Sequence, residues 1–81
     1  MQLDIYRRPE PAHKLSYLAV PAGKEIPQEV INVDWHLHAT TVELDEQSAS
    51  FAEYGIDSPG TQIKDKGYAI TSLAHQVEAS D

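Results

Sequence analysis

Asp34, His36 and His38 have the residue types and the spacing that could bind a metal ion. On a β-strand, alternate side chains point the same way about 6.6–6.8 Å apart, which lets two imidazoles share one ion. Asp34 fails this geometry, because its Cα would lie roughly 10 Å along the strand from such an ion, about twice the reach of a carboxylate. A third ligand would have to come from another strand or from the acidic segment 43–57. We therefore expect weak metal binding by His36 and His38, and no cofactor.

A second candidate site is the basic cluster near the start of the chain, formed by Tyr6, Arg7, Arg8 and Lys14. Arg7 and Arg8 point to opposite sides of a strand, so only one of them can lie beside Lys14 across a hairpin. An exposed Tyr6 beside Arg8 would form a recognition patch for an anion or an acidic peptide. The alternative is that these charges keep the hairpin soluble and guard its edge against aggregation.

Catalytic motifs are weak. The segment 55–61 has the glycine spacing of a phosphate-binding loop, but it lacks the lysine that reaches the phosphates, and Asp57 would repel them. No serine lies in a G-x-S-x-G turn, and the adjacent acids Asp45 and Glu46 lie in a polar run that is typical of solvated side chains. We expect no catalytic residues and a non-enzymatic protein.

The composition and charge of the chain argue against several classes of protein. The chain has 81 residues, which is enough for one domain (1–81), and its hydrophobic fraction of 41% suits a folded core. Its net charge of −7 divides unevenly, with +2 in residues 1–24 and −9 in residues 25–81. A chain this acidic repels nucleic acid. There is no cysteine, no apolar run that spans a membrane and no secretory signal, so we expect a cytoplasmic protein without a membrane or nucleic-acid partner.

Apolar alternation predicts the elements that would position these residues. Segments 2–8 and 14–20 form a β-hairpin, the second strand being apolar on both faces. Residues 27–30 could make one helical turn. From Val33 to Ala39 the odd-numbered residues share an apolar face, which then switches to Val42 and Leu44. That switch predicts a bulge near Thr40 and Thr41, or two short strands with a break.

The second half is predicted with less regular structure. Segment 45–55 is a short helix or an acidic loop, and we favour the loop. Ser58 caps a helix that begins at Pro59 and ends at Gly67, and residues 68–73 form a last strand. Residues 74–81 form a frayed tail. The fold class is α+β: a small antiparallel sheet of about four strands (β-β-β-α-β) with one short helix packed on a face. We expect these residues to be buried together: Leu3, Ile5, Leu18, Trp35, Leu37, Ile63 and Ile70.

Several segments resemble a family of short bacterial proteins known only as a domain of unknown function: YRRPE, KLSYLAVP, IPQE with Asn32 to Trp35, EYGID and KGYAITS. The resemblance covers the whole chain. It implies a bacterial origin and offers no catalytic residues to carry over.

Three hypotheses about function remain. The preferred one is a small binding or regulatory module that contacts another protein through a sheet face or edge. The others are a metal-binding protein that uses His36 and His38, and a structural protein that assembles with a second copy of itself. The partner, the oligomeric state and the strand order are left open by the sequence.

Overall fold

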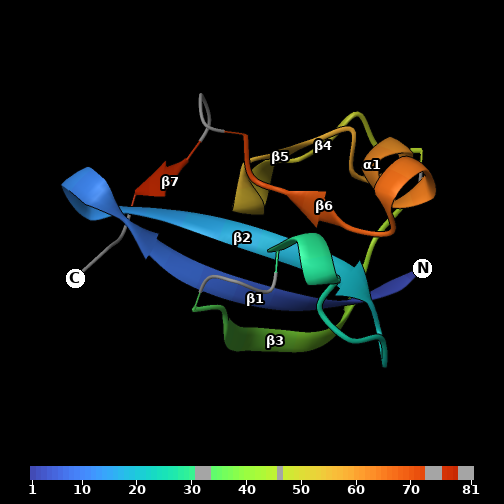
Figure 1. The fold of residues 1–81 in the computed structure, drawn as a ribbon. Helices are drawn as coiled ribbons and strands as arrows, with labels where there is room; N and C mark the ends of the chain where they lie inside the picture. Colours follow the sequence, from blue (N-terminus) through green and yellow to red (C-terminus); the bar gives the residue numbers. More distant parts are fainter. Residues whose placement is uncertain (31–33, 46, 73–75, 79–81) are drawn as a thin grey trace.

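The computed structural model describes residues 1–30, 34–45, 47–72 and 76–78 (Figure 1). Its elements follow one another as β1 (Gln2–Glu10), η1 (Pro11–His13), β2 (Lys14–Pro21), η2 (Gln28–Val30), β3 (His36–Glu43), β4 (Ser50–Phe51), η3 (Ala52–Tyr54), β5 (Ile56–Asp57), α1 (Pro59–Lys66), β6 (Ala69–Ile70) and β7 (Val77–Glu78). The main sheet has the order β3-β1-β2-β6, and β4 and β5 form a second, two-stranded sheet. The predicted α+β class is confirmed.

The hairpin of β1 and β2 is the centre of the molecule. Its antiparallel register runs from Leu3 opposite Pro21 to Glu10 opposite Lys14, so the predicted hairpin is confirmed with longer strands and a tighter turn. β3 pairs with the outer side of β1, which makes β3 one edge of the sheet (Figure 1). On the other side, β6 and β7 pair with opposite ends of β2.

Two apolar clusters lie on opposite faces of this sheet, because successive side chains of a strand point to opposite sides. The helix-side core joins one face of β1 and β2 to α1 and the β4–β5 region, and its buried members are Leu3, Ile5, Tyr17, Ala19, Leu44, Tyr54, Ile56, Ile63 and Ala69. The loop-side core consists of buried Leu18, Val20 and Tyr68, packed against the partly buried Tyr6, Ile26, Val30, Trp35 and Ile70.

The prediction of one shared core is therefore wrong. Leu3, Ile5 and Ile63 belong to the helix-side core, whereas Leu18, Trp35 and Ile70 belong to the loop-side core. Leu37 belongs to neither and is 58% exposed.

β3 is irregular where the apolar pattern of the sequence changes face. Its pairing with β1 shifts once opposite Asp4, where Thr40 and Thr41 stand against one residue, and this confirms the predicted bulge. A second shift lies at His38, between the pairs Tyr6–Leu37 and Ile5–Ala39. This second bulge turns Ala39 to the helix-side core, although Trp35 packs in the loop-side core.

The short helix begins and ends where the sequence predicts, but one cap differs. Gly67 has the left-handed φ of 89° that favours glycine, and its N–H donates to the Ile63 carbonyl at 2.8 Å. Ser58 makes no side-chain capping bond, so that part of the prediction is wrong. The helix is instead fastened by Gln62, whose amide donates to the Asp57 carbonyl at 2.6 Å and accepts from the Ile70 N–H at 3.2 Å.

The remaining segments are mostly short. Within 45–55 the chain forms β4 and the turn η3 rather than a continuous helix, and Gly55 ends η3 in a left-handed conformation. The expected strand over 68–73 is limited to Ala69–Ile70 in the described residues. In segment 74–81, predicted as a frayed tail, Val77 and Glu78 pair with β2 and Val77 packs on the helix-side core, while residues 74, 75 and 79–81 lie outside the described residues. No helix in the described part of the chain is long and apolar enough to cross a membrane.

Candidate functional site

The start of β3 brings together a group of large side chains on the loop-side face of the sheet. Leu37 stands directly opposite Tyr6 on β1, and Arg8 follows Tyr6 on the same face of that strand. The guanidinium of Arg8 lies 5.2 Å from the centre of the Trp35 ring. We call these four residues, Tyr6, Arg8, Trp35 and Leu37, the edge patch.

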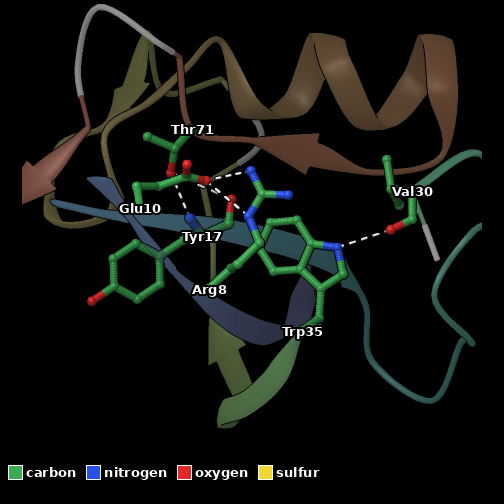
Figure 2. A network of polar contacts seen from close by, with 6 residues as sticks. All are labelled: Arg8, Glu10, Tyr17, Val30, Trp35 and Thr71. Atoms are coloured by element: carbon green, nitrogen blue, oxygen red, sulfur yellow. Dashed lines mark hydrogen bonds and ion pairs between the residues drawn. The ribbon is translucent and has the colours of Figure 1, made fainter. Parts of the chain in front are cut away.

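Trp35 is held in this position from both sides (Figure 2). Its indole N–H donates to the Val30 carbonyl at 3.0 Å, which ties the ring to the turn η2. On its other side is Arg8, whose Nε donates to the Glu10 carboxylate at 2.8 Å and whose Nη2 forms an ion pair with the same oxygen. The Glu10 carboxylate therefore neutralises Arg8 and fixes the guanidinium near the indole.

The opposite face of the same strands carries different chemistry. Arg7 is in register with His36 on β3 and with Tyr17 on β2, so the side chains of these three residues lie on one face of the sheet. The ring of His38 lies edge-on to Tyr17, with 5.4 Å between ring centres, and 6.1 Å from the ring of Tyr54. We call the three basic residues on this face, Arg7, His36 and His38, the basic row.

The tyrosines beside the basic row are fixed by a buried hydroxyl. Thr71 Oγ1 accepts from the Tyr17 N–H at 2.8 Å and lies 2.6 Å from the Tyr54 carbonyl, to which it donates. Burial is the main cause that raises the pKa of the Tyr54 phenol above its usual value, and the negative charge of Glu53 adds to it. The Tyr54 phenol beside His38 therefore stays protonated at neutral pH.

The structure divides the basic cluster predicted from the sequence. Tyr6 and Arg8 come together in the edge patch, whereas Arg7 lies on the other face of the sheet. Lys14 stands opposite Glu10 at the hairpin turn and is partly buried. Sequence reasoning missed Leu37 as a surface residue, because alternation with Trp35 and Ala39 is also the pattern of a buried face.

His36 and His38 are both exposed, but they are not equivalent. The ring of His38 packs edge-on against Tyr17, while His36 stands beside Arg7. Among the described residues, no cluster of three or more His, Cys, Asp or Glu side chains could hold a metal ion. These residues show no third ligand for the two histidines.

A comparison with protein families places the chain. The model of a family of unknown function, DUF6139, matches residues 1–77. The chain belongs to DUF6139. No curated protein and no solved structure matches it. The DUF6139 match includes the edge patch and the basic row, so both lie in the part of the chain that the family shares.

Proposed function

We propose that this protein is a small non-enzymatic binding module that recognises another protein through the edge patch. The observation that carries the proposal is Leu37, which is 58% exposed on a strand whose outer side pairs with no other described strand. An unpaired strand edge offers backbone donors and acceptors to an incoming chain. An exposed leucine beside it offers apolar area that a partner would bury.

The composition of the patch supports the proposal. Trp, Tyr and Arg are the residues most often found to dominate binding energy at protein interfaces. Trp35 and Arg8 are already ordered by Val30 and Glu10, so a partner would lose little side-chain entropy in contacting them.

The two bulges in β3 also concern the alternative hypothesis, in which this edge of the sheet is protected against aggregation. Bulges are a device by which sheets prevent unwanted pairing. They begin at His38, so His36 and Leu37 remain regularly paired to β1 ahead of them. This short stretch is the part of the edge that a partner could use.

The test compares three versions of the protein as immobilised bait in a lysate of the source cells. The versions are the natural chain, Leu37→Asp and the matched control Thr61→Asp, an equally charged change at an exposed position on α1. Bound proteins are measured by quantitative mass spectrometry. We expect at least one protein to be captured by the natural chain and by Thr61→Asp about tenfold more than by Leu37→Asp, which is roughly 1.4 kcal/mol of binding energy.

The stability of the variants must be measured alongside. Because Leu37 lies mostly in solvent, Leu37→Asp should change the free energy of unfolding by about 0.5 kcal/mol or less. Equal capture by all three versions, with folding intact, would show that the edge patch is not the binding surface.

A further inference from the structure

The start of β3 presents alternating chemistry to any chain that pairs with it. His36 lies on the face of Arg7, Leu37 on the face of Tyr6, and His38 on the helix side against Tyr17. A strand added beside β3 would place its own side chains on the same two faces by turns. Its residues opposite the two histidines would meet the basic row, and the residue between them would meet Leu37 and the edge patch.

The charge on the basic row is uncompensated by an ion pair. Arg7 is exposed, and within the described residues no ion pair or hydrogen bond engages its side chain. The carboxylate of Glu10 is already taken up by Arg8. Neither Asp34, two residues before His36, nor Glu53, next to Tyr54 in the chain, forms an ion pair with Arg7. The row thus favours an acidic group on the incoming strand.

A second copy of the chain is a poor candidate for this position. Its own acid–apolar–acid stretch is Glu43-Leu44-Asp45, but Leu44 is only 5% exposed in the helix-side core and its N–H donates to the Met1 carbonyl at 2.8 Å. Releasing this stretch would remove a core residue. A two-fold contact centred on Leu37 would instead place His36 of one copy opposite His38 of the other, so that no carboxylate would meet the basic row.

We infer that the edge patch, given the proposed function, takes an extended acidic segment of a different protein, with an apolar residue between two carboxylates. The carboxylates face the basic row and the apolar side chain covers Leu37. Because the bulges limit regular pairing to the first residues of β3, few backbone hydrogen bonds form, and the side chains determine which partner binds.

The chain carries its own reporter for a direct test, since Trp35 is its single tryptophan and lies in the edge patch. Three capped synthetic peptides are titrated while Trp35 fluorescence is followed: Ser-Glu-Leu-Glu-Ser, Ser-Gln-Leu-Gln-Ser and Ser-Lys-Leu-Lys-Ser. We expect the Glu peptide to bind about tenfold more tightly than the Lys peptide, with the Gln peptide between them, as two exposed charge contacts allow. Its binding should weaken when NaCl is raised from 50 to 500 mM.

Variants locate the effect. Arg7→Gln should weaken binding of the Glu peptide about threefold, and Leu37→Asp should abolish it. The control Lys24→Gln removes an exposed cation outside the basic row and should leave binding unchanged.

The outcomes separate this inference from the proposed function. If the Glu peptide binds no better than the Lys and Gln peptides, the inference is wrong, while Leu37-dependent capture from the lysate would still support the binding module. Equal losses in Arg7→Gln and Lys24→Gln would likewise overturn it, because overall charge would then suffice. If neither the peptides nor any lysate protein depends on Leu37, both proposals fail.

Discussion

At the scale of single residues, the buried hydroxyl of Thr71 connects β2 to η3 beside the basic row. Its hydroxyl accepts from the Tyr17 N–H on β2 and donates to the Tyr54 carbonyl on η3, and both contacts are buried. Its own N–H donates to the Tyr17 carbonyl at 3.0 Å. One residue after β6 thus holds together the two tyrosines against which His38 rests.

We predict that Thr71→Val, which keeps the shape and removes the hydroxyl, lowers the free energy of unfolding by about 1–3 kcal/mol. The reason is that a buried N–H and a buried carbonyl each lose their partner. Thr71→Ser keeps the hydroxyl and should cost less. Urea unfolding followed by circular dichroism measures both variants, and a loss in Thr71→Ser as large as or larger than that in Thr71→Val would show that the hydroxyl is not the main contribution of Thr71.

At the scale of elements, the bulge at Thr40 and Thr41 in β3 depends on one carboxylate from the neighbouring strand β1. Asp4 Oδ1 accepts from the N–H of Thr41 at 3.3 Å, and Oδ2 accepts from the N–H of Gly23 at 3.1 Å. Thr41 has a φ of 50°, a left-handed conformation that is rare for a β-branched residue. Asp4 therefore holds the bulge and the turn after β2 in one arrangement.

We predict that Asp4→Ala lowers the free energy of unfolding by about 1 kcal/mol, since two exposed hydrogen bonds to backbone N–H groups are lost. Thr41→Gly should raise it by about 1 kcal/mol, because glycine adopts positive φ without strain. Both are measured by urea unfolding. A stabilised Asp4→Ala variant, or a destabilised Thr41→Gly variant, would contradict this account of the bulge.

How much of β3 the sequence predicts depends on what alternation can reveal. The change of apolar face after Ala39 indicates an extra residue, and the bulge at Thr40 and Thr41 follows from it. Alternation does not reveal whether a face is covered. The turn η2 covers the Trp35 end of the loop-side face, but Leu37 lies at the open edge, where nothing in the described residues packs over it.

The candidate site was predictable to a similar extent. That Arg7 and Arg8 point to opposite faces follows from the period of a strand. Which of them is neutralised does not follow. The ion pair of Arg8 depends on the local geometry of Glu10 and on Trp35, which is far from Arg8 in the sequence. The apolar pattern gives no sign of the bulge at His38, because Leu37 and Ala39 on either side of it keep the spacing of a regular strand.

At the scale of the whole molecule, the charge is unevenly distributed and poorly compensated. Residues 25–81 carry a net charge of −9, against +2 for residues 1–24. Exposed carboxylates without an ion pair among the described residues are Glu25, Asp34, Asp45, Glu53 and Asp65. Repulsion among such charges is relieved when the chain unfolds and the charges separate.

We predict that added salt stabilises the folded protein. Raising NaCl from 10 to 500 mM shortens the screening length from about 30 Å to under 8 Å, so repulsion between exposed carboxylates on a protein of this size is largely removed. The thermal midpoint, followed by circular dichroism, should therefore rise by a few degrees. The double variant Glu25→Gln/Glu53→Gln removes two of the unpaired charges, so its midpoint at 10 mM NaCl should be higher than that of the natural chain and should rise less with salt. A midpoint that falls as salt is added would mean that favourable ion pairs, such as that of Arg8 with Glu10, outweigh the repulsion.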